Sequence, residues 1–155
     1  LSALEAGALT VMVSLSSWNG EKCHGSHHLI TDILKGELGF RGFVVSDWDG
    51  TDQLDDDYET AVALAVNAGI DMFMVPEKWK ALIGHMRDLV GRGAVPLERI
   101  DDAVRRILRV KFAYGLFDRP RPAERPWSNH AGFGSADCDP AAAACAASAW
   151  SWSRA

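Results

Sequence analysis

Residues 39–50 read Gly-Phe-Arg-Gly-Phe-Val-Val-Ser-Asp-Trp-Asp-Gly, a stretch that indicates an α/β fold. Residues 43–45 predict a short strand buried on both faces, because helix-covered parallel strands are apolar throughout. The strand ends at Asp47 and Trp48, before a turn at Gly50. A carboxylate at the carboxyl end of such a strand lies where α/β folds bind ligands, and an indole beside it suits the C–H face of a sugar ring. A lone Asp here is also compatible with capping of a following helix.

The composition is that of an ordinary soluble domain: 155 residues, 48% hydrophobic and 24% charged. The net charge is −5 and no basic stripe is present, so nucleic acid is not an expected partner. No apolar run reaches the roughly 18 residues that span a bilayer, so no membrane contact is expected. The three cysteines have unrelated spacings and indicate neither a disulfide framework nor a zinc site. No metal or other cofactor is expected.

The chain alternates apolar runs with amphipathic segments. Continuous apolar runs predict strands at 8–15, 43–46 and 70–75. Apolar residues spaced i, i+3, i+4 and i+7 predict helices at 27–37, 59–68, 78–90 and 97–114. The last helix is expected to bury its apolar set, Ile100, Val104, Ile107, Leu108 and Phe112. Its charged residues are expected to point outward, namely Asp101, Asp102, Arg105, Arg106 and Arg109.

Strands separated by helices of this length form parallel βαβ units. Three strands are too few for a whole parallel sheet, and a complete (β/α)8 barrel takes about 250 residues. We therefore expect an α/β fold in which residues 1–118 form the last strands and helices of a partial (β/α)8, TIM-like barrel. Residues 119–155 are expected to form a linker and a disordered or aberrant low-complexity tail. A reading-frame shift near Ala136 is our hypothesis for that tail.

Several segments together resemble glycoside hydrolase family 3. They are the run from Val11 to Gly20, Leu29–Gly39, Ser46–Trp48, Ala68–Pro76 and Arg99–Phe117. These segments have the family's order and spacing, and the resemblance extends from about residue 5 to residue 120. It is closest to the β-glucosidase and glucan exohydrolase branch, and it implies the C-terminal half of the family's catalytic barrel.

The resemblance implies a retaining glycosidase, in which one carboxyl group acts as nucleophile and a second as acid/base. Asp47 aligns with the nucleophile that forms a covalent glycosyl-enzyme, and Trp48 aligns with a residue lining the sugar subsite. Ser14 and Trp18 follow the preceding strand and are expected to face the substrate as well. The implied reaction is hydrolysis of terminal non-reducing β-D-glucosyl residues from a β-glucoside or β-glucan oligosaccharide.

Other polar residues in these loops are assigned lesser roles. Asp49 and Asp52 are expected to face solvent or to cap a helix, and Asp71 is expected to be structural. Lys22 and His24 look like a catalytic pair. The family's sugar-binding Lys–His pair lies on an earlier strand, however, so no catalytic role is expected for these two residues.

The resemblance also implies partners outside this chain, namely an N-terminal half-barrel with further sugar contacts and a C-terminal domain that carries the acid/base. Relatives often have Tyr at the position of Leu15, and some have Arg near Gln53. General acid catalysis contributes about 10²–10⁴-fold, so the chain alone is expected to be close to inactive. The alternative is an inactive remnant or a non-catalytic sugar-binding half-barrel that needs a partner chain. The family favours a periplasmic or secreted location, for which this sequence carries no signal.

Overall fold

The computed structural model describes residues 2–132, 140 and 142 of the chain. The chain divides into two compact units, Leu1–Phe117 and a second unit that begins at Asp118. The described part of the second unit includes the short helix η4 (Pro122–Glu124). The aberrant tail hypothesised from Ala136 onward falls almost wholly on residues outside this description, and it stays a prediction.

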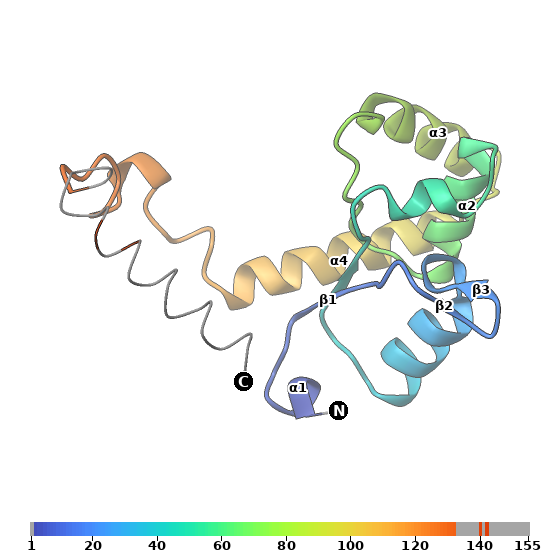
Figure 1. Ribbon diagram of the computed structural model, residues 1–155, viewed down its shortest axis with the longest axis horizontal. Helices are drawn as coiled ribbons and strands as arrows, with labels where there is room; N and C mark the ends of the chain where they lie inside the picture. Colours follow the sequence, from blue (N-terminus) through green and yellow to red (C-terminus); the bar gives the residue numbers. More distant parts are fainter. Residues whose placement is uncertain (1, 133–139, 141, 143–155) are drawn as a thin grey trace. The chain divides into compact units, whose positions relative to one another are not determined.

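Two short parallel strands lie at the centre of the first unit (Figure 1). β1 (Thr10–Met12) pairs with β4 (Phe43–Val45), with Thr10 opposite Phe43 and Met12 opposite Val45. One further ladder bond joins the Val13 N–H to the Val45 carbonyl at 3.0 Å. Both strands lie within the ranges that the sequence predicts, and their parallel pairing is confirmed.

A hairpin that the sequence analysis did not predict follows β1. Its strands are β2 (Ser17–Trp18) and β3 (Glu21–Lys22), paired antiparallel across Asn19 and Gly20. Both turn residues have positive φ, 50° and 84°. Asn-Gly is the preferred dipeptide for a type I′ turn, which needs positive φ at both central positions. The hairpin carries the chain from β1 to the short helix η1 (Cys23–Gly25).

The prediction of a third strand at 70–75 is wrong, because this segment forms no regular strand. The segment does, however, lie beside β4. It forms a single parallel bridge, between Val45 and Met72. The Ser46 N–H donates to the Met72 carbonyl at 2.9 Å, and the Met74 N–H donates to Ser46 Oγ at 2.8 Å. The ladder stops here because a side-chain hydroxyl takes the place of the next backbone acceptor, and Pro76 follows shortly after.

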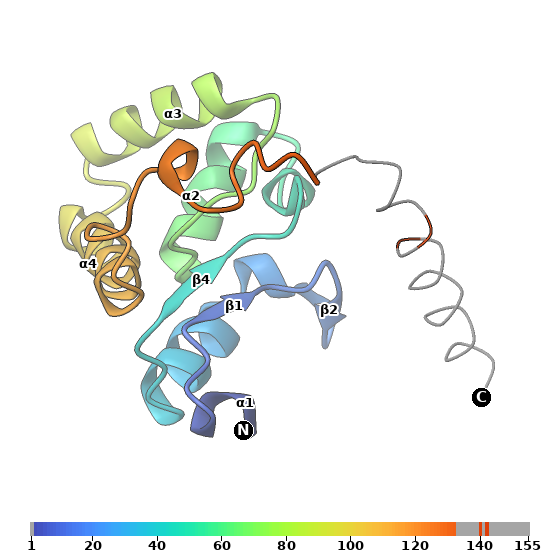
Figure 2. The ribbon, with the colours of Figure 1, turned by 90° about the vertical axis from the view of Figure 1, so that its left-hand side faces the viewer.

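The four predicted helices are confirmed to within two residues at their ends. They are η2 (His28–Glu37), which has π-type hydrogen bonding, α2 (Tyr58–Ala68), α3 (Trp79–Gly91) and α4 (Leu97–Ala113). Two shorter elements complete the unit, α1 (Ser2–Glu5) and η3 (Gly50–Gln53). Figure 2 shows α2 and α3 on the β4 side of the strand pair and the segment 28–37 on the β1 side. The chain is therefore an α/β fold built from βαβ units.

The core has two clusters that share α2. One surrounds the strands and consists of Val13, Ile30, Phe40, Val44, Ala65, Ala68 and Ile70. The other lies between α2 and α3 and consists of Val62, Val66, Leu89 and Val95. Small residues on α2 let the helix pack closely against its neighbours, which is why its buried side is rich in alanine. The described helices include none that is long and apolar enough to cross a membrane.

The orientation predicted for α4 is wrong in part. Val104, Leu108 and Phe112 are 48%, 39% and 66% exposed, although the apolar spacing predicts their burial. The buried residues of this helix are instead Ala103 and Val110.

The prediction that the charged residues of α4 point outward is confirmed for Asp101 and Arg105, but Arg106 and Arg109 instead hold the helix in place. Arg106 Nη1 donates to the carbonyl groups of Phe40 and Gly42, at 2.8 and 3.0 Å. Arg109 Nη1 donates to the Arg41 carbonyl at 2.9 Å. The segment before β4 presents unpaired carbonyl groups, and guanidinium groups satisfy them better than apolar side chains do.

A buried carboxylate joins three elements at the amino end of β4. The Asp71 side chain is fully buried; Oδ1 accepts from Lys35 Nζ at 2.8 Å and from Arg99 Nη2. Oδ2 accepts from the Val44 N–H at 2.8 Å. Burial lowers the pKa of Lys35 to about 8, although the hydrogen bond to Asp71 opposes the shift. The structural role predicted for Asp71 is confirmed: it ties η2 and α4 to β4.

We predict that Gly42→Ala destabilises the strand pair by about 1–3 kcal/mol. A Cβ at Gly42 lies 2.6 Å from the Leu9 carbonyl carbon and 2.7 Å from Phe40 Cζ, so β1 and β4 have to move apart. Urea unfolding monitored by circular dichroism measures the loss. The control is Gly84→Ala in α3, where nothing lies within 4 Å and alanine favours the helix by about 0.5–1 kcal/mol. Equal midpoints for the two variants contradict the prediction.

Candidate active site

The site begins where β4 ends. Asp47 is half-buried, and its Oδ1 accepts from the Trp48 N–H at 2.7 Å. Its carbonyl accepts from the Gly50 N–H at 3.1 Å, which closes a tight turn. Trp48 is exposed, and Asp49 takes a left-handed backbone conformation with φ 49°. The structure therefore has the predicted pair, a carboxylate and an open indole, directly after a buried parallel strand.

The segment 74–78 supports this loop from one side. The Asp49 N–H donates to the Met74 carbonyl at 3.2 Å. Lys78 Nζ lies 2.6 Å from Asp52 Oδ2, and the same ammonium group lies 4.9 Å from the centre of the Tyr58 ring. Asp52 was expected to face solvent or to cap a helix, but it is ion-paired within the unit. Its charge serves to hold the loop.

His24 supports the loop from the other side, and sequence reasoning missed it. The imidazole is only 1% exposed, and its Nε2 accepts the Asp47 N–H at 2.9 Å. Burial lowers the pKa of His24, and the charge on Lys22 lowers it further. The Asp47 carboxylate and a hydrogen bond with the Ser14 backbone act in the opposite direction. The site thus favours neutral imidazole.

The β2–β3 hairpin also reaches the far end of the loop. Lys22 Nζ donates to Gln53 Oε1 at 2.9 Å. Lys22 and His24, which look like a catalytic pair, therefore contact opposite ends of the loop that carries Asp47. A Lys and a His two residues apart, just after an Asn-Gly turn, were the only sequence signal for this arrangement.

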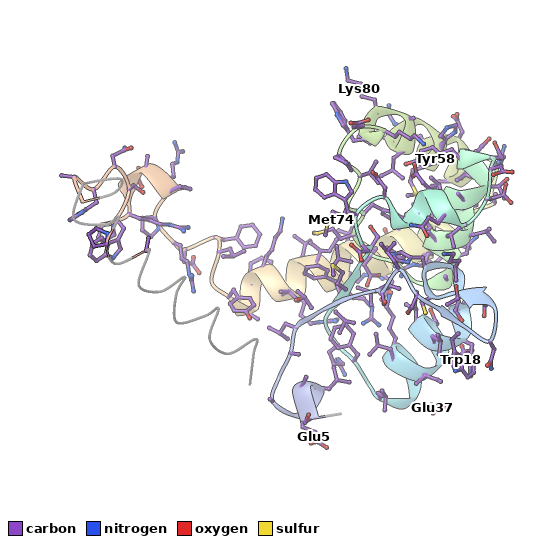
Figure 3. The ribbon with its side chains drawn as sticks, viewed as in Figure 1. Glu5, Trp18, Glu37, Tyr58, Met74 and Lys80 are labelled. Atoms are coloured by element: carbon purple, nitrogen blue, oxygen red, sulfur yellow. The ribbon has the colours of Figure 1, made fainter. Side chains whose placement is uncertain are left out.

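The other two predicted site residues are placed differently. Ser14 is exposed, and its Oγ accepts from Ser16 Oγ at 2.9 Å, while its backbone contacts His24. The Trp18 ring lies 6.0 Å from the ring of His28. Figure 3 shows Trp18 well away from Met74. The structure thus links Ser14 to the Asp47 loop through His24, but it does not bring Trp18 to that loop.

The class is an α/β domain whose carboxylate and exposed indole lie at the carboxyl end of a parallel strand, the place where such domains bind ligands. Residues 1–110 match the family model described as the glycosyl hydrolase family 3 N-terminal domain. The chain belongs to glycosyl hydrolase family 3. Because the matched model describes the N-terminal domain, it does not support the expected placement in a C-terminal half.

Known proteins similar to this chain include glucosidases, xylosidases and a glucanase. A lysosomal beta glucosidase of Dictyostelium discoideum is 41% identical over 123 residues, which cover 76% of this chain and 15% of that protein. A periplasmic beta-glucosidase of Salmonella typhimurium is 37% identical over 124 residues, covering 77% and 16%. The crystal structure of an exo-1,3/1,4-beta-glucanase from a Pseudoalteromonas species has a TM-score of 0.76 and 44% identity, covering 83% and 16%. The chain therefore spans about one sixth of the length of these relatives.

Proposed function

We propose that this chain is part of a retaining β-glucosidase or exo-β-glucanase in which Asp47 is the nucleophile. The observation that carries the proposal is the position of Asp47 at the carboxyl end of β4, with its amide held by His24 and Oδ1 held by the Trp48 N–H. A nucleophile that is already held in its reactive orientation does not have to lose conformational entropy to reach the transition state. Membership of the family and the names of the similar glucosidases support the same assignment.

In the proposed reaction, an Asp47 oxygen attacks the anomeric carbon of a β-glucoside as the bond to the leaving oxygen breaks. An acid/base group gives the leaving oxygen its proton. The glycosyl ester on Asp47 is then hydrolysed by water, which regenerates the carboxylate. Because the Trp48 N–H occupies Oδ1, we assign the attack to Oδ2. The exposed Trp48 indole is suited to stack against the terminal glucosyl ring.

The proposal assigns the remaining tasks to parts outside this chain. β1, β4 and the segment 70–75 form a piece of a (β/α)8 barrel, whose other strands carry further sugar contacts. A separate domain carries the acid/base. The expected partners are thus those two parts and a β-glucoside or β-glucan oligosaccharide, in a periplasmic, secreted or lysosomal compartment like those of the similar proteins. On this view the chain alone has little activity.

The second candidate is a non-catalytic sugar-binding remnant. Two features favour it: Leu15 stands where relatives often have Tyr, and Gln53, near which some relatives have Arg, is already bonded to Lys22. A site with fewer polar groups for the sugar binds it less tightly and orients it less well. This candidate predicts sugar binding without turnover.

Covalent trapping separates the two candidates. A 2-deoxy-2-fluoro-β-glucoside with a dinitrophenolate leaving group needs no acid catalyst, so it tests the nucleophile alone. We expect mass spectrometry to find one fluoroglucosyl group on the peptide that contains Asp47. The reagent is applied to this chain and to a chimera in which residues 2–117 replace the matching segment of the Pseudoalteromonas glucanase. A label on a different residue, or an unlabelled chimera that still binds glucose, overturns the proposal.

A further inference from the structure

We propose that His24 is a positioning residue: its neutral imidazole holds the backbone amide of Asp47 and so fixes the direction of that carboxylate. This inference rests on the proposed role of Asp47. The contact is a 2.9 Å hydrogen bond between Asp47 N–H and Nε2 of a ring that is almost completely buried. His24 does not itself meet the reacting atoms.

The direction of this bond fixes the tautomer of His24. Because the Asp47 N–H donates, Nε2 carries a lone pair, and the ring proton is on Nδ1. The hydrogen bond between His24 and the Ser14 backbone gives that proton an acceptor, since a carbonyl accepts it. A protonated imidazole has no lone pair for the Asp47 amide, so the contact exists only with the neutral ring.

The ring also supports the turn that follows Asp47. A Cβ at Gly50 lies 2.7 Å from His24 Cε1, so the backbone of Gly50 rests directly on the imidazole. The turn from the Asp47 carbonyl to the Gly50 N–H therefore closes over His24. Only glycine permits this approach.

Two bonds then determine where the carboxylate points. His24 fixes the peptide plane on the amino side of Asp47, and the Trp48 N–H fixes Oδ1 on the carboxyl side. If the first bond is lost, the peptide is free to rotate and the second weakens as well. A shift of about 1 Å in a catalytic group costs on the order of 10² in rate, so this support matters for the proposed reaction.

Two variants of similar size separate positioning from simple packing. In His24→Gln the amide oxygen reaches the position of Nε2 and still accepts from Asp47. In His24→Asn the amide reaches only the position of Nδ1, so the Asp47 N–H loses its acceptor. Amide hydrogen exchange is measured by NMR on the whole ¹⁵N-labelled chain. We expect exchange at Asp47 and Trp48 to be up to about tenfold faster in His24→Asn, with most of the protection retained in His24→Gln.

The Phe43 amide, bonded to the Leu9 carbonyl at 3.2 Å, is the internal control. Its exchange is expected to be the same in both variants. If Phe43 also exchanges faster, the variant has lost the strand pair, and the ¹⁵N shifts of His24 in the unsubstituted chain decide instead. Those shifts are expected to report an unprotonated Nε2 and a protonated Nδ1.

Equal exchange at Asp47 in the two variants, or a proton on Nε2, overturns the proposal. Neither measurement depends on glycosidase activity. A fluoroglucosyl label on a residue other than Asp47 contradicts the proposed function. Equal amide exchange in the two His24 variants contradicts the positioning role. The two failures can therefore be told apart.

Discussion

Replacing Asp71 with Asn is expected to destabilise the first unit by about 3–5 kcal/mol. The substitution keeps the shape of the side chain but removes the charge that Lys35 and Arg99 share. Both cations are largely buried, with side chains 6% and 14% exposed, so water does not replace the lost carboxylate. Breaking a buried ion pair by removing one partner costs far more than the net contribution of the intact pair.

The control for this prediction is Asp101→Asn on the outer side of α4. Asp101 pairs with Arg105 at 3.3 Å, but both side chains are more than half exposed. A solvent-exposed pair of this kind contributes about 0–1 kcal/mol. Urea unfolding of the two variants gives the difference directly. A loss of less than about 1 kcal/mol in Asp71→Asn contradicts the account of the buried network.

The same network has a consequence for the candidate site. Asp71 Oδ2 accepts from the Val44 N–H, three residues before the proposed nucleophile. Ser46 is the residue before Asp47, and its Oγ accepts from the Met74 N–H. Side chains thus complete the hydrogen bonding of β4 where its strand neighbour stops. The end of β4 is held on both edges, by β1 and by the segment 70–75, and this support is what makes the position of Asp47 definite.

The sequence predicted the features that depend on local patterns. The apolar runs at 8–15 and 43–46 and the helical periodicity of 78–90 need only neighbours along the chain, and the structure has them in place. The position of Asp47 after a buried strand belongs to the same class of prediction. Asn19-Gly20 was an equally local signal for a hairpin, but the sequence analysis did not use it.

Features that depend on distant parts of the chain were not predictable in the same way. The burial of His24 arises from the contact of η1 with the 47–50 turn, which lies more than twenty residues further on. The apolar spacing of α4 predicts one buried face, but Val104, Leu108 and Phe112 on that face are exposed, so periodicity alone does not say what packs against the helix. Arg106 decides the matter through its bonds to Phe40 and Gly42, more than sixty residues away.

Replacing Asp47 with Asn is expected to lower kcat of the chimera on an aryl β-glucoside by at least about 10³-fold, because no other group forms the glycosyl ester. The matched control is Asp49→Asn in the same turn. Its left-handed backbone accepts Asn without strain, and we expect kcat within about threefold of the unsubstituted chimera. Comparable losses in the two variants contradict the assignment.

The stereochemistry of chemical rescue gives a second test of the same role. In Asp47→Gly the space left by the carboxylate admits azide, which attacks the anomeric carbon from the face that Asp47 occupied. A β-glucoside with a good leaving group is then converted to the α-glycosyl azide, because only one displacement takes place. A β-azide product, or rescue that also occurs in Asp49→Gly, shows that the nucleophile lies elsewhere. An α-azide that forms only in Asp47→Gly places the attacking oxygen at the end of β4.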